Sequence, residues 1–380
     1  LFKMIFINYT FGINSMRKTC EEIKVNVAYR WFLGIDIYEE VPNYSTWSKN
    51  YQRRYKDSQV FDQIFNHIIK YGIDNKFIDT TTVFGDGTHR KANANSRKAT
   101  DKEVEMIAKT YEKELLDEIN EERKRNGKKP FESLIKKEYA FDEETGETIE
   151  LKKTKHIKES TTDPECGLFH KGEKQKCFAY THMTMSDKHG YVLYNRVAPG
   201  NMHDSAIFSE IYDELIHMYE NIKNVCLDAG FNTSPICHQI LSSGRTPFLP
   251  YKRPMTKKGF FKKYEYAYDE YYDCYICPNN EVLSYSTTDK NGYKQYKSNP
   301  DKCANCPLKD QCTKSKNHQK IILRHIWEEY KEQANENRYT QNWKDNYPKR
   351  KETIERVFGD CKEQHNLRFT RVRGLLKNGQ

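Results

Sequence analysis

The stretch RKETIERVFGDCK, residues 350–362, predicts an amphipathic helix on which the rest of the fold depends. Its apolar residues recur at the i, i+3, i+4 and i+7 spacing and would form one buried helix face; they are Ile354, Val357, Phe358 and Cys361. At about 100° per residue, Lys351, Glu355 and Lys362 fall along one edge of that face. A carboxylate beside cations at the margin of a core suits a metal site that acts on phosphate. The pattern is equally typical of an ordinary surface helix with i, i+4 ion pairs.

The composition limits the classes of protein to which the chain can belong. Its 380 residues are enough for about two or three domains, and 37% of them are hydrophobic. No apolar run approaches the roughly 20 residues that cross a bilayer, so no membrane association is expected. The excess of 63 Lys and Arg over 54 Asp and Glu favours a polyanionic partner. Because the chain begins with Leu1, we expect it to be a fragment.

The order of sequence patterns predicts an α/β fold with a mixed sheet, helices on its faces and two insertions. The predicted segments are a helical module (1–75), a first strand (76–90), a charged helical insertion or linker (91–165), a core of strands and helices (166–254), a cysteine-rich insertion (255–345), and a final helix with a basic tail (346–380).

Two aspartates are expected where strands end. Asp86 lies between glycines at the end of a Thr-rich and aromatic-rich run, and Asp228 follows the short apolar run 224–227. Two other aspartates are weaker candidates than Asp228 for the second acid. Asp204 immediately precedes an apolar-periodic helix, as a cap would, and Asp163 before Pro164 indicates a turn. Ligands collect at strand ends in α/β sheets.

The carboxylates of Asp86, Asp228 and Glu355 could therefore share one or two hard cations. Mg²⁺ prefers oxygen ligands and leaves positions for substrate phosphates. Two such ions would clamp the attacking and leaving oxygens of a phosphoryl displacement. The basic run 49–56, which includes Arg53 and Arg54 among tyrosines, suits phosphate contacts but also fits a solvated surface helix.

Five of the eleven cysteines lie between residues 274 and 312. Paired cysteines at this spacing favour a structural zinc site in a zinc-ribbon-like insertion, in a reducing cytoplasm. An iron–sulfur cluster is the alternative. The favoured zinc ligands are Cys277, Cys303, Cys306 and Cys312, with Cys274 as the spare.

The motifs around these residues resemble those of DDE transposases of bacterial insertion sequences, whose catalytic domain has a ribonuclease-H-like fold. The motifs that carry the resemblance are DGTHRKANAN (86–95), STTDPE (160–165), PGNMHDS (199–205), LDAGF (227–231), ERVFG (355–359), residues 368–374 and the N-terminal YRWFLG (29–34). The resemblance covers nearly the whole chain.

The resemblance implies that Asp86, Asp228 and Glu355 are the catalytic residues and hold two Mg²⁺ or Mn²⁺ ions. It also implies that Lys362 contacts DNA phosphate. Relatives place an Arg four residues before the Glu. Here Lys351 occupies that position, and Arg350 and Tyr347 are displaced by one. A lysine keeps the charge but loses the two-pronged fork of arginine. The DNA-binding residues expected from these arguments are Lys362, Lys351, Arg350, Arg356, Arg53 and Arg54.

The expected function is cleavage at the ends of an insertion sequence followed by 3′-hydroxyl strand transfer into target DNA. The expected partners are double-stranded DNA at the terminal repeats and the target, and a second copy of the chain. Two alternatives remain open: an inactive DNA-binding relic, and a ribonuclease-H-like nuclease without strand transfer.

Overall fold

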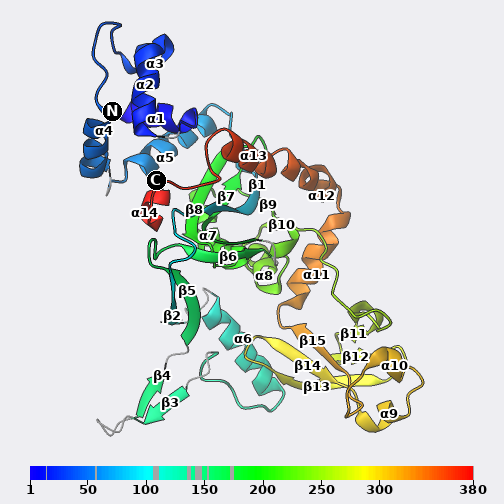
Figure 1. The fold of residues 1–380 in the computed structure, drawn as a ribbon. Helices are drawn as coiled ribbons and strands as arrows, with labels where there is room; N and C mark the ends of the chain where they lie inside the picture. Colours follow the sequence, from blue (N-terminus) through cyan, green and yellow to red (C-terminus); the bar gives the residue numbers. More distant parts are fainter. Residues whose placement is uncertain are drawn as a thin grey trace. The chain divides into compact units, whose positions relative to one another are not determined.

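The fold is taken from a computed structural model of the chain, and the structure describes residues 1–13, 15–55, 58–105, 111–134, 138–141, 148–151, 154–171 and 175–379. The chain divides into two compact units, each built from separate pieces of sequence (Figure 1). Unit 1 contains residues 1–102, 156–228 and 341–380, and unit 2 contains residues 103–155 and 229–340. The predicted mixed α/β character is confirmed. Within the described residues, no helix combines the length and the apolarity needed to cross a membrane.

The N-terminal part of unit 1 is helical, as predicted. Its elements are α1 (Phe2–Thr10), α2 (Met16–Val25), α3 (Val27–Leu33), α4 (Tyr44–Asn50), the π-helical turn η1 (Tyr51–Tyr55) and α5 (Val60–Asp74). The apolar spacing of residues 19–32 predicts a single helix, but the structure divides it, because Asn26 takes an extended conformation and its side chain caps α3. A buried cluster that includes Met4, Ile23 and Trp47 holds these helices together.

The central sheet of unit 1 combines antiparallel and parallel pairing. Its strands are β1 (Thr82–Lys91), β6 (Gly167–Lys171), β7 (Gln175–Ser186), β8 (Val192–Pro199) and β9 (Asn224–Cys226). Strand β1 pairs antiparallel with β7 on one side and parallel with β9 on the other, while β7 also pairs with β6 and β8. Helix α7 (Asp204–Met218) packs against β7 and β8 (Figure 1).

Two strand-like runs, 177–183 and 191–197, flank the turn residues 186–190 in the sequence and predict a hairpin, which β7 and β8 form. Its turn is held by Asp187, a fully buried aspartate whose Oδ1 accepts hydrogen bonds from the backbone N–H groups of His189 and Tyr191. The other oxygen, Oδ2, accepts from the N–H of Asp79, which leads into β1. One aspartate therefore fixes both the turn and the start of the first strand.

The final helix begins later than predicted. The C-terminal elements are α12 (Gln341–Asn346), the 3₁₀ turn η5 (Tyr347–Lys351), α13 (Ile354–Glu363) and α14 (Leu375–Gly379). Pro348 favours the tight turn, and Thr353, with φ −105° and ψ −101°, separates it from α13. From Ile354 onward the predicted apolar face is correct, since α13 packs against β1 and β7 with Ile354 and Phe358 buried.

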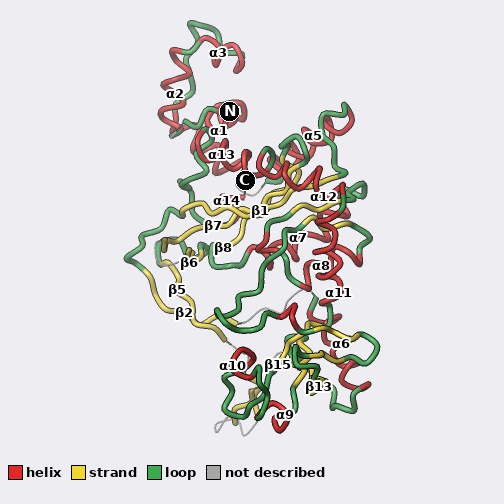
Figure 2. The backbone as a smooth tube through the Cα atoms, turned by 90° about the vertical axis from the view of Figure 1, so that its right-hand side faces the viewer, coloured by secondary structure: helices red, strands yellow, loops and turns green. Residues whose placement is uncertain are grey.

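Unit 2 contains both helices and strands (Figure 2). Its helices and turns are α6 (Glu112–Arg125), η2 (Ala229–Phe231), α8 (Ser234–Ser242), η3 (Lys263–Glu265), α9 (Pro300–Ala304), α10 (Lys309–Cys312), α11 (Glu328–Glu336) and η4 (Asn337–Tyr339). Its strands are β3 (Glu138–Phe141), β4 (Thr148–Leu151), β10 (Thr246–Phe248), β11 (Ala267–Asp269), β12 (Cys274–Ile276), β13 (Val282–Thr288), β14 (Tyr293–Lys297) and β15 (Ile321–His325).

The cysteine-rich segment folds as a five-stranded antiparallel sheet in the order β11-β12-β13-β14-β15. Its buried cluster is largely tyrosine, with Tyr266, Tyr275 and Tyr296 beside Leu283 and Ile322. Tyrosine rings thus supply the apolar area that the few aliphatic residues of this segment do not.

The charged insertion is not only helical. The sequence pattern of residues 104–125 predicts a helix throughout, but α6 begins at Glu112, and residues 106–110 lie outside the described part. Residues 99–105 instead form β2 (Ala99–Glu105), which pairs with β5 (Thr154–Ser160). The chain therefore enters the insertion along one strand and leaves it along a paired strand, which periodicity within a single segment cannot reveal.

Candidate functional site

Arg350 links two of the three predicted carboxylates in unit 1. It is 6% exposed, and its Nη2 donates a hydrogen bond to Oδ2 of Asp86 at 2.9 Å. Its Nη1 lies 4.0 Å from Oε1 of Glu355. Asp86 comes from the sheet, whereas Arg350 and Glu355 come from η5 and α13. One guanidinium therefore contacts both Asp86 and Glu355, the first and the last of the three predicted carboxylates along the chain.

Asp86 lies inside β1 rather than at its end, which corrects the prediction from sequence. The strand continues to Lys91 because β7 pairs with it along its whole second half. In the register of the sheet, Asp86 stands opposite Thr184. Asp228 lies where it was expected, just after β9, which is parallel to β1.

Three aspartates influence one another electrostatically around β1. The pKa of Asp86 is raised to about 6, chiefly by burial and also by the negative charges of Asp228 and Asp204, although Arg350 and the N–H of Gly87 act to lower it. Burial also raises the pKa of Asp204, with Asp228 adding to the effect and His203 opposing it. The carboxylates of Asp86, Asp204 and Asp228 thus share one partly buried environment.

Asp204 is a member of this group that the sequence interpretation missed. It was taken for the cap of α7, but the capping residue is His203, whose Nδ1 accepts from the N–H of Ser205 at 3.3 Å. Asp204 instead places its carboxylate against the backbone of Gly87. A Cβ at position 87 would lie 2.6 Å from Cγ of Asp204. The glycine directly after Asp86 was the signal that a side chain approaches there.

Tyr347 belongs to the same neighbourhood. Burial raises its pKa, Arg350 lowers it through its charge and a hydrogen bond, and Asp228 raises it. Since η5 is a 3₁₀ turn and not part of α13, spacing along an ideal helix does not apply across residues 350–355. The one-residue displacement of Tyr347 and Arg350 in the sequence therefore does not remove them from the acids, and Lys351 is exposed.

The other predicted DNA-binding residues lie on the surface of unit 1. Arg53 and Arg54 are exposed on η1. On α13, Nε of Arg356 lies 3.7 Å from Oδ2 of Asp360, and Nζ of Lys362 lies 6.0 Å from the ring centroid of Phe358.

Asp163 has a structural role, in line with its interpretation as part of a turn. It is 1% exposed, and its Oδ1 accepts hydrogen bonds from the hydroxyl of Tyr180 at 2.8 Å and from the N–H of Gly374 at 3.1 Å. It therefore attaches the C-terminal tail to β7.

The cysteines of the predicted zinc site lie near one another in unit 2. Sγ of Cys277 accepts from the N–H of Glu281 at 3.4 Å, and the charges of Cys303 and Cys277 both act on Cys312. The hydroxyl of Tyr266 lies 3.2 Å from Sγ of Cys312. Cys274 is buried at the start of β12. Among the described cysteines, however, no three sulfurs lie within 4.8 Å of one another.

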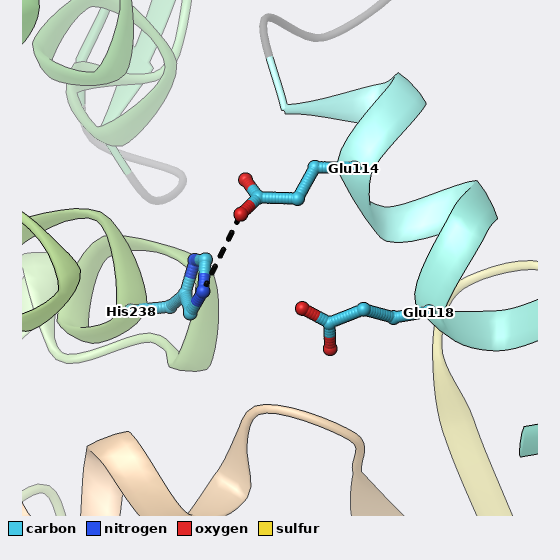
Figure 3. A group of neighbouring side chains, drawn as sticks. All are labelled: Glu114, Glu118 and His238. Carbon is cyan, nitrogen blue, oxygen red and sulfur yellow. Dashed lines mark ion pairs between the residues drawn. The ribbon is translucent and has the colours of Figure 1, made fainter. Parts of the chain in front are cut away.

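A different group in unit 2 meets that distance criterion. One ligand atom from each of Glu114, Glu118 and His238 lies within 4.8 Å of the others, in the part of the chain that is described (Figure 3). The His238 ring stacks on Trp327 at 4.1 Å, and Nε1 of Trp327 donates to Glu118 at 2.6 Å. Burial lowers the pKa of His238, which favours the neutral imidazole. The group could hold a cation, although these contacts also explain it as packing between α6 and α8, and the sequence interpretation did not foresee it.

Two family models match the chain, one near each end. The model described as "Transposase domain (DUF772)" matches residues 1–53, and the model described as "Transposase DDE domain" matches residues 276–379. The second match contains Glu355 and the four cysteines of the predicted zinc site, whereas Asp86 and Asp228 lie outside both matches. No curated protein and no solved structure matches the chain. Together the two matches confirm the resemblance to DDE transposases of insertion sequences that was found in the motifs.

Proposed function

We propose that the protein cuts DNA at the ends of an insertion sequence and joins the freed 3′-hydroxyl to target DNA. The observation that carries this proposal is the contact of Arg350 with both Asp86 and Glu355, in the neighbourhood of Asp228. Two parallel strands and a C-terminal helix supply these acids from three distant parts of the chain. Among the described residues, these three carboxylates do not all lie within 4.8 Å of one another, so bound cations would have to draw them together.

The donor set fits Mg²⁺ or Mn²⁺. The side chains of Asp86, Asp228 and Glu355 offer only carboxylate oxygens. The raised pKa of Asp86 reflects burial first and the negative charges of Asp228 and Asp204 second, and a divalent cation would offset both effects. When bound, two such ions would supply charge stabilisation for the attacking and leaving oxygens of the phosphodiester. Arg350 orients Asp86 and Glu355, and Lys362 on the next turns of α13 would grip a DNA phosphate.

The topology of unit 1 supports a ribonuclease-H-like catalytic fold. The strand order β8-β7-β1-β9 puts three antiparallel strands beside one parallel strand, with α7 connecting β8 to β9. In this interpretation residues 76–90 and 166–254 form the catalytic core, 91–165 and 255–345 are insertions, and 346–380 completes the core. Residues 1–75 would then be a separate DNA-binding module.

A structural Zn²⁺ held by Cys277, Cys303, Cys306 and Cys312 is the second part of the proposal. The N–H group of Glu281 that points at Sγ of Cys277 stabilises a thiolate, the form that binds zinc. An iron–sulfur cluster would use the same ligands. We further infer that the protein acts as a homodimer on DNA, in the cytoplasm.

A joining assay tests the function. The donor would be duplexes from the DNA that flanks the gene, the target a supercoiled plasmid, and the cofactor Mg²⁺. Glu355→Gln should lower joining by at least about 100-fold, the scale on which a lost transition-state interaction acts. Glu352→Gln is the matched control, because Glu352 is exposed and lies outside the acidic group.

The three candidate functions give different products in this assay. A transposase joins donor to target, a nuclease only cuts, and an inactive relic only binds. Cutting without joining, or equal joining by Glu355→Gln and wild type, would overturn the proposal.

A further inference from the structure

A basic pocket in unit 1 lies outside the acidic group. It has a volume of about 50 Å³ and is lined by Tyr9, Arg90, His365, Arg371, Lys377 and Asn378, among others. A single water needs roughly 10–15 Å³ by the same kind of measure, so the pocket has space for several waters or for a group of about phosphate size.

The pocket carries positive charge with no acid in its wall. Of the described residues that line it, none is Asp or Glu, whereas two arginines and a lysine are present. Burial lowers the pKa of Arg90, and the nearby positive charge of Arg371 lowers it further. Burial also lowers the pKa of Arg371. Two guanidinium groups that oppose each other's charge would both be stabilised by an anion between them.

A donor in this pocket is unused. Nε of Arg90 is buried and has no hydrogen-bond partner, although a buried N–H group normally has one. The phenol of Tyr9 offers a further hydroxyl, and its charge acts on both Arg90 and Arg371. Guanidinium and hydroxyl donors around a small pocket are the groups that proteins use to bind phosphate.

The pocket is fixed by contacts between the two ends of unit 1. Nη1 of Arg371 donates to the carbonyl of Ile13 at 2.8 Å, and the side chain of Asn366 donates to the carbonyl of Gly12. The backbone is so close here that a Cβ on Gly12 would lie 2.3 Å from the carbonyl oxygen of Gln364. The loop after α1 and the segment after α13 thus hold the cationic side chains in place.

The position of the pocket relates it to the proposed active site. Arg90 and Asp86 lie four residues apart on β1, so their side chains project from the same face of the sheet. Their separation along the strand is roughly 13 Å, at about 3.3 Å per residue. A DNA strand whose scissile phosphate met Asp86 would pass within reach of Arg90 with a phosphate about two nucleotides away.

We propose that this pocket binds one backbone phosphate of the DNA substrate and so sets the position of the strand relative to Asp86. The inference rests on the proposed function for the identity of the ligand. The chemistry itself would also accept free inorganic phosphate, so the test separates these two sources.

The test measures how duplex DNA binding depends on salt. The variants are Arg90→Gln and Arg371→Gln, with Arg371→Lys as the version that keeps the charge. The control is Arg368→Gln, because Arg368 is exposed and ion-paired with Glu363 outside the pocket. Losing one phosphate contact should reduce the slope of log K against log salt by about 0.9 and weaken binding to all sequences alike. Arg371→Lys and Arg368→Gln should keep the wild-type slope.

A second arm uses inorganic phosphate and follows thermal unfolding of wild type and Arg90→Gln at constant ionic strength. An unchanged DNA slope in both glutamine variants would overturn the proposal. If phosphate then stabilised wild type alone, the pocket would be a site for a free anion. Wild-type protein that bound duplex normally but failed to join it would overturn the proposed function and not the pocket. A variant that unfolds before the assay is replaced by Lys377→Gln, which must reduce the slope in the same way.

Discussion

Opposing electrostatic effects act on the pKa of Asp86. Burial and the charges of Asp204 and Asp228 favour its protonated form, while Arg350 favours its ionised form, and burial dominates so that the pKa is about 6. Asp79, nearer the start of the same segment, shows the opposite balance. Burial raises its pKa, but hydrogen bonds from Lys188 and Thr81 outweigh that effect and lower the pKa to about 2. The difference is that burial outweighs the effect of Arg350 at Asp86, whereas the hydrogen bonds from Lys188 and Thr81 outweigh burial at Asp79.

The raised pKa of Asp86 predicts a pH-dependent affinity for Mg²⁺. A folded pKa near 6, against an ordinary value of 3.8, means that protonation stabilises the metal-free fold below about pH 4 and that this stabilisation is lost as the pH rises through 6. The cation must displace that proton. Mg²⁺ affinity should therefore fall roughly tenfold per pH unit below 6 and level off above it. Calorimetric titration from pH 5 to 8 would measure this, and a flat profile would exclude Asp86 as a ligand.

Arg350 should contribute stability only where Asp86 is ionised. In magnesium-free buffer at pH 8, Arg350→Gln leaves the partly buried carboxylate without its cation and should lower the free energy of unfolding by about 1–3 kcal/mol. At pH 5, where Asp86 is largely protonated, the loss should be clearly smaller. Urea unfolding at both pH values gives the comparison, with Arg350→Lys retaining part of the stability. Equal losses at pH 5 and pH 8 would contradict the ion pair.

The approach of α7 to β1 depends on one small residue. Asp204 in the first turn of α7 lies against Gly87, so Gly87→Ala forces the Asp204 carboxylate to move. The expected cost is about 1–3 kcal/mol of unfolding free energy. Gly359→Ala in α13 is the control, because its Cβ would meet no atom within 4 Å and should stabilise the helix by about 0.5–1 kcal/mol. Two changes of the same sign and size in thermal or urea unfolding would argue against the close approach.

The sheet of unit 2 should depend on its metal. Wild-type protein should contain about one zinc per chain by elemental analysis, and Cys303→Ser or Cys306→Ser should lose it together with much of the folded signal of this segment. Cys274→Ser should keep the zinc, since Cys274 is buried in β12 as the spare. Iron in place of zinc, with visible absorption, would indicate the cluster instead. Full zinc content in Cys303→Ser would contradict the ligand set.

The elements show which parts of the structure the sequence could predict. Apolar spacing identified the buried face of α13 at Ile354 and Phe358, and alternation with turn residues identified the hairpin of β7 and β8. The break at Thr353 was missed because it depends on how η5 fits against the sheet. The extension of β1 beyond Asp86 was missed because it depends on pairing with β7, which is remote in sequence.

The candidate site was only partly predictable for the same reason. Three acids could be selected from motifs, but the role of Asp204 required knowing that α7 reaches Gly87. The contact of Arg350 with Asp86 joins residues 264 positions apart, across a turn whose geometry an ideal helix does not describe. The resemblance, in which an Arg precedes the Glu, had suggested a DNA contact for Arg350.

At the scale of the whole molecule, each of the two units is built from segments that are far apart in the sequence. Unit 1 is complete only with residues 341–380, which pack beside the first strand. The two family matches lie near opposite ends of the chain. The proposed site depends on that closure, because Glu355 and Arg350 come from the last segment. A truncation before residue 341 would therefore remove the cation that holds Asp86.

Iron-mediated backbone cleavage tests the common metal site most directly. Fe²⁺ replaces Mg²⁺, and ascorbate then produces radicals that cut the polypeptide beside the ion. We expect cuts near Asp86, Asp228 and Glu355 that excess Mg²⁺ suppresses together. Cuts near His238 would report the separate group in unit 2. Cleavage beside one of the three acids alone, or cleavage that Mg²⁺ does not affect, would contradict the account.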